Sequence, residues 1–114
     1  MAGTVLLVED DPMVRSILKD MLEDLGCAVV TASCGKEALA LLATNKDISL
    51  LVTDVNMPEM DGIELGKRAA AMRRDLKTLL ISGRGDQTNG FPLLRKPFDT
   101  NSLKKRLQET VGRC

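Results

Sequence analysis

The chain has 114 residues, the length of one compact domain, and its composition, 44% hydrophobic and 28% charged, excludes a disordered or fibrous protein. Its 16 basic and 16 acidic residues balance, and it contains no His, Trp or Tyr, which excludes a catalytic His, a His metal ligand and a Tyr nucleophile. The three Cys stand at spacings that match no zinc site. We therefore expect a single domain over residues 1–114.

The apolar stretches are short, and Val5 to Val8 falls far below the roughly 18 residues that indicate a membrane span. The first residues lead into a strand-like segment without a signal-peptide pattern. These features favour a cytoplasmic protein without membrane contact. The bases of the second half are scattered, and no aromatic residues interleave them, so we expect no direct nucleic-acid binding.

Five short apolar or β-branched runs are typical of buried strands. They comprise residues 4–8, 28–32, 48–53, 77–82 and 92–95. A helix is predicted after the first run, because Asp11 is a good N-cap, Pro12 suits the first helical position, and Gly26 suits the end. Its predicted inner face consists of Val14, Ile17, Leu18, Met21, Leu22 and Leu25.

Three further helices follow from the same three-four spacing. One covers about residues 36–44, with Ser33 or Cys34 near its cap. One runs from about residue 61 to 73, with Leu65, Ala69 and Met72 predicted to be buried. The last begins after Asp99, and its predicted inner residues are Leu103, Leu107 and Val111.

Alternating strands and helices of this length predict a doubly wound α/β fold, because each crossover helix packs back onto a parallel sheet. One interval breaks the alternation: residues 83–90 contain three Gly and no apolar face. A full helix is not expected there, so the helix before the fifth strand is predicted to be short or irregular.

Polar side chains follow four of the five predicted strands. Glu9 and Asp10 follow the first, Asp54 the third, Ser82 ends the fourth and Lys96 follows the fifth. The carboxyl ends of parallel strands meet at one edge of the sheet, where ligands collect in this class of fold. We therefore expect these side chains to lie close together.

Neighbouring carboxylates such as Asp10 and Asp54 repel one another unless a cation compensates them, and oxygen-only ligands favour Mg²⁺. Lys96 would supply a further positive charge and clamp an incoming phosphoryl group. Asp54 could then attack phosphorus and become an aspartyl phosphate, to which Ser82 could donate a hydrogen bond.

Four stretches of the chain resemble one known family. They are Leu6 to Pro12, Thr53 to Gly62 with its Asp-x-Asn-Met-Pro-x-Met-Asp-Gly pattern, Leu80 to Gly83, and Arg95 to Phe98. In this order and over essentially the whole chain, they resemble the receiver domain of two-component response regulators. The resemblance implies a flavodoxin-like three-layer sandwich with five parallel strands in the order 2-1-3-4-5.

The resemblance also implies that Asp54 is the phosphoacceptor and that a sensor histidine kinase or a His-containing phosphotransfer domain is the donor. Mg²⁺ would be held by Asp10, Asp54 and the backbone carbonyl of Asn56, with Glu9 acting through water. The implied function is a phosphorylation-dependent switch of a phosphorelay. Such a switch catalyses only its own phosphorylation and dephosphorylation, and is not an enzyme acting on metabolites.

By the same resemblance, Lys96 would contact the phosphoryl oxygens and Ser82 would be the switch hydroxyl. Leu93 stands where many relatives carry an aromatic residue that turns inward on activation. The short interval at residues 83–90 is similar to that of receivers attached to hybrid sensor kinases. A monomer or a weak dimer is compatible with the sequence.

Two other functions stay open at this point. Asp54-Val55-Asn56 loosely resembles the Asp-x-Asp nucleophile of Mg²⁺-dependent phosphatases, although the second Asp is missing. A receiver-like interaction module that is never phosphorylated is the other alternative. Turnover of phosphomonoesters would indicate the first, and failure to bind Mg²⁺ would indicate the second.

Overall fold

The computed structural model describes residues 3–83, 90–96 and 98–111. Five parallel strands form one sheet in the order β2-β1-β3-β4-β5. Their bounds are β1 Thr4–Val8, β2 Ala28–Ala32, β3 Ile48–Asp54, β4 Lys77–Ser82 and β5 Leu93–Arg95. The doubly wound fold, the strand positions and the order 2-1-3-4-5 are thereby confirmed.

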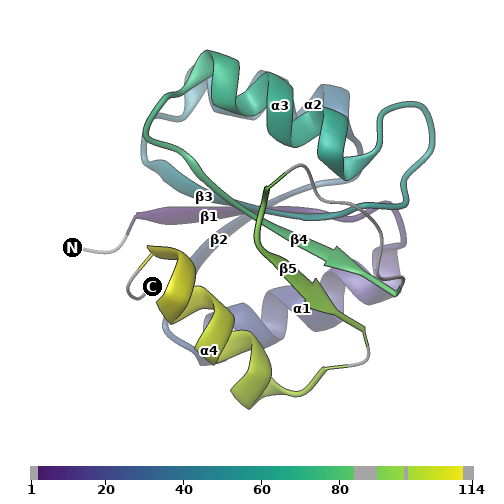
Figure 1. Ribbon diagram of the computed structural model, residues 1–114, viewed down its shortest axis with the longest axis vertical. Coiled ribbons are helices and arrows are strands. Elements are labelled where there is room, and N and C mark those ends of the chain that lie inside the picture. The colour runs from purple at the N-terminus through teal and green to yellow at the C-terminus, as the bar shows by residue number, and fades with distance from the viewer. Residues whose placement is uncertain (1–2, 84–89, 97, 112–114) are drawn as a thin grey trace.

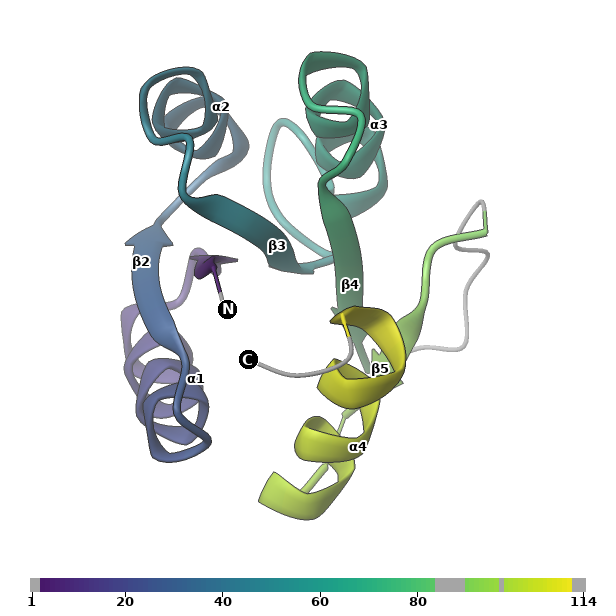
Figure 2. The same cartoon turned by 90° about the vertical axis from the view of Figure 1, so that its left-hand side faces the viewer.

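Helices cover both faces of the sheet (Figure 1). Within the described residues there are four: α1 Pro12–Asp24, α2 Gly35–Thr44, α3 Gly62–Met72 and α4 Thr100–Val111. Helices α1 and α4 lie against one face, and α2 and α3 lie against the other (Figures 1 and 2). The expected short or irregular helix before the fifth strand falls mainly on residues 84–89, outside the described residues.

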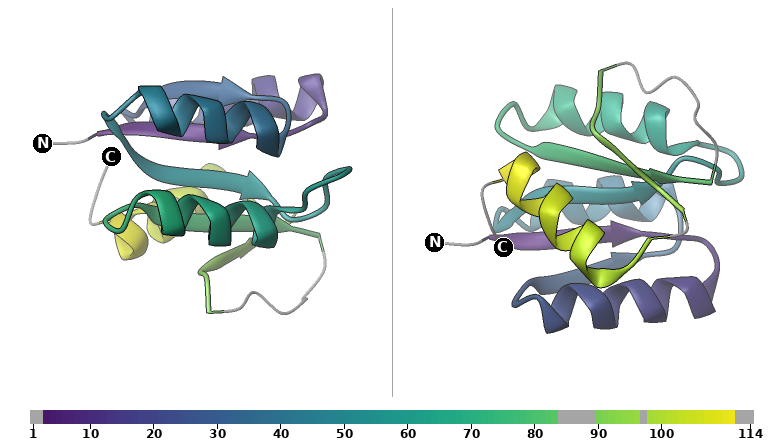
Figure 3. Two further views of the ribbon diagram at one scale, coloured as in Figure 1. Left: turned by 90° about the horizontal axis from the view of Figure 1, so that it is seen from above. Right: turned by 60° about the horizontal axis from the view of Figure 1, so that its bottom comes forward.

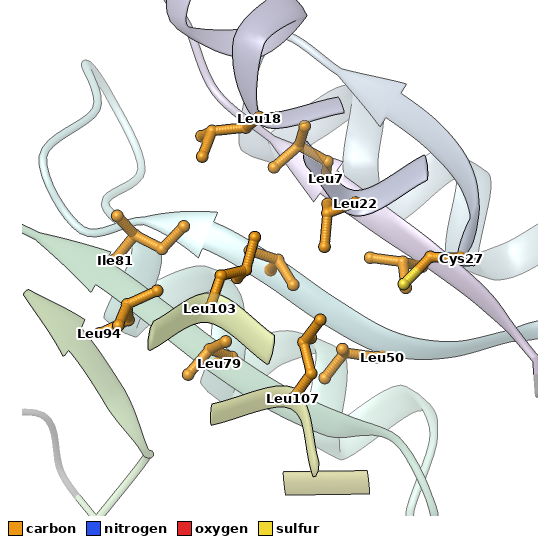
Figure 4. Packing of buried hydrophobic residues seen from close by; sticks show 12 residues of the cluster. Leu7, Leu18, Leu22, Cys27, Leu50, Leu79, Ile81, Leu94, Leu103 and Leu107 are labelled. Carbon is orange, nitrogen blue, oxygen red and sulfur yellow. The ribbon is translucent and has the colours of Figure 1, made fainter. Parts of the chain in front are cut away.

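Alternate residues of each strand point to opposite faces, and both faces are buried. In β1, Val5 and Leu7 face α1 and α4, whereas Leu6 and Val8 face α2 and α3. The first of these two clusters is shown in Figure 4, where Leu18 and Leu22 of α1 meet leucines of α4 over the middle strands. This two-sided packing explains why the strands are nearly continuous apolar runs.

The helix starts follow the predicted capping chemistry. The Asp11 carboxylate accepts hydrogen bonds from the N–H groups of Met13 and Val14 at the start of α1. At α2 the N-cap is Cys34, whose side chain makes no capping bond. Glu37 instead accepts hydrogen bonds from both the N–H and the hydroxyl of Ser33. The predicted starts of all four helices, and the predicted ends of the first three, are confirmed to within one or two residues.

Two residues predicted to be buried are exposed. The side chain of Ile17 on α1 is 55% exposed, and that of Met72 in the last turn of α3 is 45% exposed. Helix α1 contacts the sheet through the Leu18 and Leu22 stripe, so Ile17 lies at the edge of the interface.

Met72 lies beside an open cavity of about 500 Å³ near the carboxyl ends of α2 and α3. Leu103 and Leu107 of α4 are buried as predicted, and the side chain of Val111 lies outside the description.

No helix in the described part of the chain has the length and apolar content that a membrane crossing needs.

Candidate functional site

The carboxyl ends of the four neighbouring strands β1, β3, β4 and β5 lie at the same edge of the sheet (Figure 3), and the polar residues that the sequence singled out stand at or just beyond these ends. Asp54 is the last residue of β3, and Ser82 is the last residue of β4. Glu9 and Lys96 directly follow β1 and β5. Residues from four separate segments therefore meet at one edge of the sheet.

Asp54 is held in a fixed orientation by one donor on each carboxylate oxygen. Oδ1 accepts a hydrogen bond of 2.9 Å from the N–H of Asn56, and Oδ2 accepts one of 2.7 Å from Nζ of Lys96. The residue is only 7% exposed. Its carboxylate therefore stands near the surface but cannot turn freely.

Glu9 is the most deeply buried acid of the site, with 3% of its surface exposed. Its Oε2 accepts a hydrogen bond of 3.0 Å from the N–H of Asp11. Its Oε1 lies 3.8 Å from Nζ of Lys96 and has no hydrogen-bond partner among the described residues. Burial raises the pKa of Glu9 to about 7; the Asp11 N–H opposes this shift, and the Asp54 and Asp10 carboxylates add to it.

Lys96 is the positive charge shared by these acids. Burial disfavours its ammonium, but the hydrogen bond and the charge of Asp54, with the charges of Glu9 and Asp10, outweigh burial and raise the pKa of Lys96. Its backbone N–H donates a 2.8 Å hydrogen bond to the carbonyl of Ser82. The end of β5 is thus tied to the end of β4, which places the ammonium beside Asp54.

The other candidate residues lie around this centre. Asp10 is exposed in the turn between β1 and α1, close enough for its carboxylate to raise the pKa of Glu9 and for its charge to raise the pKa of Lys96. Asn56 is exposed just beyond β3, and Ser82 is fully buried. Leu93 is half-buried and lines a cavity of about 390 Å³ between β5 and α4, apart from the acids.

The donor set fits a magnesium ion in its chemistry. Glu9, Asp10 and Asp54 offer only oxygen atoms as ligands, the type that Mg²⁺ prefers. The buried Oε1 of Glu9 has no hydrogen-bond partner among the described residues. In the described part of the chain, no three His, Cys, Asp or Glu side chains converge tightly enough to enclose an ion.

Two further residues help to build the site, although the sequence analysis gave neither of them a role in it. Gly62 opens α3 so close to β3 that a Cβ atom there would collide with the backbone carbonyl of Asp54. Arg15 of α1 donates a 2.8 Å hydrogen bond from Nη1 to the backbone carbonyl of Glu9. The Asp-Gly pair before the third helix was a usable signal for Gly62, whereas nothing in the spacing of Arg15 pointed back to Glu9.

The fold and this edge together define a class of domain: a doubly wound α/β sandwich with an acid pair, a central Asp and a Lys at the carboxyl ends of its strands. Comparison with known proteins agrees. The family model described as the response regulator receiver domain matches residues 5–108. The chain is 34% identical over 119 residues to the chemotaxis protein CheY homolog of Campylobacter jejuni, covering 95% of this chain and 92% of that protein.

Solved structures show the same likeness. Chemotaxis protein CheY4 of Vibrio cholerae superposes with a TM-score of 0.88 at 29% identity, covering 97% of this chain and 100% of that one. The response regulator TrrA of Thermotoga maritima, solved in complex with Mg²⁺ and BeF, has a TM-score of 0.84 at 26% identity, with 94% of this chain and 97% of that chain covered.

The chain belongs to the response regulator receiver domain family. It is a CheY-like receiver domain, a type of domain that acts in phosphorylation-dependent two-component signalling. The phosphatase and the unphosphorylated interaction module are not favoured by these likenesses.

Proposed function

We propose that Asp54 accepts a phosphoryl group from a phosphohistidine and that this modification switches the single domain formed by residues 1–114. The observation that carries the proposal is the Asp54 carboxylate, held by the Asn56 N–H on one oxygen and by the Lys96 ammonium on the other. A carboxylate oriented in this way is poised as a nucleophile, and a cation already stands beside it.

In the proposed transfer, an oxygen of Asp54 attacks phosphorus and a P–O bond forms. The P–N bond of the phosphohistidine breaks, and its electron pair stays on the imidazole nitrogen of the donor. Lys96 neutralises the negative charge of the phosphoryl oxygens, and the hydroxyl of Ser82 donates a hydrogen bond to one of them. Asp10, Asp54 and the carbonyl of Asn56, with Glu9 through water, would hold Mg²⁺, which supplies further charge neutralisation when bound.

The site is proposed to catalyse only the phosphorylation and dephosphorylation of its own Asp54, and not the turnover of metabolites. Supporting this, the acids and Lys96 are arranged around the chain's own Asp54. A cytoplasmic location follows for the proposed switch, because a histidine donor is charged from ATP there.

The partner proposed is a sensor histidine kinase or a His-containing phosphotransfer domain. Beside the site, helix α1 exposes two large apolar side chains, Met13 at 73% and Ile17 at 55%. These residues are four positions apart, so they share one side of the helix and could pack together against a partner. We expect Ile17→Asp to slow transfer from phosphorylated histidine donors of the source organism at least tenfold, while labelling by acetyl phosphate stays unchanged.

The direct test is labelling with acetyl phosphate and Mg²⁺, followed by intact-mass spectrometry. The unchanged protein should gain one phosphoryl group, and Asp54→Asn should gain none. Asp47→Asn, which neutralises an exposed acid just before β3, is the matched control and should be labelled normally. A phosphoryl group retained in Asp54→Asn would disprove the proposal.

A further inference from the structure

Arg15 lies beside the site, and its side chain bonds to the backbone of the turn and not to a reacting group. It lies on the first turns of α1, half-buried, and its guanidinium reaches back over the turn between β1 and α1. Nη1 donates a 2.8 Å hydrogen bond to the carbonyl oxygen of Glu9, and the backbone N–H of Arg15 donates to the carbonyl of Asp11 at 2.9 Å. Arg15 thus closes the turn that carries Glu9 and Asp10.

The carbonyl of Glu9 belongs to the peptide group that joins Glu9 to Asp10. The N–H of Glu9 is tied to β2 through the carbonyl of Ala32 at 3.1 Å, so that side of the residue is fixed by the sheet. Beyond Glu9 the sheet ends, and the orientation of the next peptide plane is set by Arg15. The direction of that plane decides where the Asp10 side chain points, because a peptide group is rigid and planar.

We propose that Arg15 is a positioning residue for the magnesium site: by fixing the peptide between Glu9 and Asp10, it aims Asp10 and Glu9 at the ion. This inference rests on the proposed function, since that function assigns the ion. Residues that hydrogen-bond to metal-binding residues and so orient them commonly contribute ten- to a hundredfold to metal affinity.

A purely electrostatic role predicts the opposite sign. The guanidinium is a positive charge near a cation site, so its removal alone would tighten Mg²⁺ binding. Arg15 also faces Glu37 of α2, whose pKa is lowered mainly by the hydrogen bonds from Ser33 and to a smaller extent by the charge of Arg15. A role confined to Glu37 would leave Mg²⁺ affinity unchanged. The sign of the change in affinity therefore separates positioning from both alternatives.

The test measures the Kd of Mg²⁺ by isothermal titration calorimetry on the unphosphorylated protein. Arg15→Met should raise Kd by about tenfold, and Arg15→Lys, which keeps the charge and a donor, should stay within roughly threefold of the unchanged protein. Arg68→Met, which removes an exposed Arg paired with Glu64 on α3, is the control and should bind normally. Unchanged or tighter binding in Arg15→Met overturns the proposal. Should Arg15→Met fail to fold, Arg15→Gln takes its place.

A second readout needs no metal. The N–H of Asp11 donates to Oε2 of Glu9, so its hydrogen exchange reports whether the turn keeps its shape. In Arg15→Met and without Mg²⁺, this amide should exchange about tenfold faster, while the N–H of Glu64, bonded to Asp61 at the start of α3, should not change. If the unchanged protein binds no Mg²⁺, the proposed function fails. Hydrogen exchange at the Asp11 amide still decides whether Arg15 fixes the turn. If this amide exchanges at the same rate in Arg15→Met as in the unchanged protein, Arg15 does not fix the turn and the inference is overturned.

Discussion

Lys96 carries the charge balance of the site, because its ammonium lies 2.7 Å from Oδ2 of Asp54 and 3.8 Å from Oε1 of Glu9. The side chain is one-third exposed, so it can contact a phosphoryl group that arrives from solvent. Lys96→Met should therefore slow labelling by acetyl phosphate by about 10²-fold, the usual cost of removing one electrostatic contact in a transfer reaction.

The initial rate by intact-mass spectrometry checks this prediction. Lys77→Met, a change of the same kind at the exposed start of β4, should label at the normal rate. A rate for Lys96→Met within a few-fold of the unchanged protein would show that Lys96 takes no part in transfer.

Glu59 is the one residue other than Gly with a positive φ in the described part of the chain, at 69°. This left-handed conformation costs an L-residue about 1–2 kcal/mol, and β-branched residues tolerate it worst. Glu59→Gly should be at least as stable as the unchanged protein, because Gly adopts the conformation without strain. Glu59→Val should lower the free energy of unfolding by about 1–2 kcal/mol. Urea denaturation measures both, and equal stabilities of the Gly and Val variants would contradict the argument.

At the scale of whole elements, the contact between α3 and the segment before β5 explains a Gly inside a helix. Gly66 is buried, and a Cβ atom there would lie 3.0 and 3.1 Å from two ring atoms of Phe91. Gly66→Ala alone should therefore lower the free energy of unfolding by about 1 kcal/mol, because the overpacking against the ring exceeds the gain in helix propensity.

A double-mutant cycle tests this contact. In a Phe91→Leu background the obstacle is smaller, so Gly66→Ala should raise the free energy of unfolding by about 0.5–1 kcal/mol. The sign of the Gly66→Ala effect reverses only if Phe91 is the cause. An equal effect in both backgrounds, measured by urea denaturation, would rule out the contact.

The start of α2 is sensitive to acid through Glu37. The hydrogen bonds from Ser33 lower the pKa of Glu37 below its ordinary 4.5. The charged carboxylate therefore contributes stability above about pH 4.5, and that contribution is lost as the pH falls through the lower folded-state pKa. Because Glu37 is exposed and solvent screens its charge, Glu37→Gln should lower the free energy of unfolding by only about 0.3 kcal/mol at pH 7, and the difference should shrink as the pH is lowered below 4.5. Thermal unfolding over a pH series from 7 downward checks this prediction; a difference that does not shrink below pH 4.5 would contradict it.

The elements themselves were predictable because each carries a local signal. Asp11 and Pro12 mark the start of α1, and continuous apolar runs mark strands buried on both faces. Errors arose where periodicity alone was used. Ile17 and Met72 have the spacing of inner residues, but how wide a stripe a helix buries depends on the neighbouring elements, which spacing does not contain.

At the scale of the whole molecule, the parallel sheet turns four distant segments into one site. The position of Asp54, Glu9 and Lys96 at a common edge followed from strand ends alone. Two contacts could not be predicted in this way: the lack of a hydrogen-bond partner for Oε1 of Glu9 among the described residues, and the hydrogen bond from Arg15 to the Glu9 carbonyl. Both depend on side-chain directions within one turn. Sequence reasoning thus reached the residues of the site but not the contacts that orient them.

Mg²⁺ is expected to stabilise the whole fold, because the acids that would bind it meet only in the folded chain. A ligand that binds the folded state alone at ten times its Kd adds about 1.4 kcal/mol to the free energy of unfolding. Urea denaturation with Mg²⁺, against NaCl of equal ionic strength, measures this gain. The unchanged protein and the surface control Asp47→Asn should show it, and Asp10→Asn and Asp54→Asn should lose most of it. An equal gain in all four proteins would mean that Mg²⁺ acts away from the edge where Asp54 and Lys96 meet.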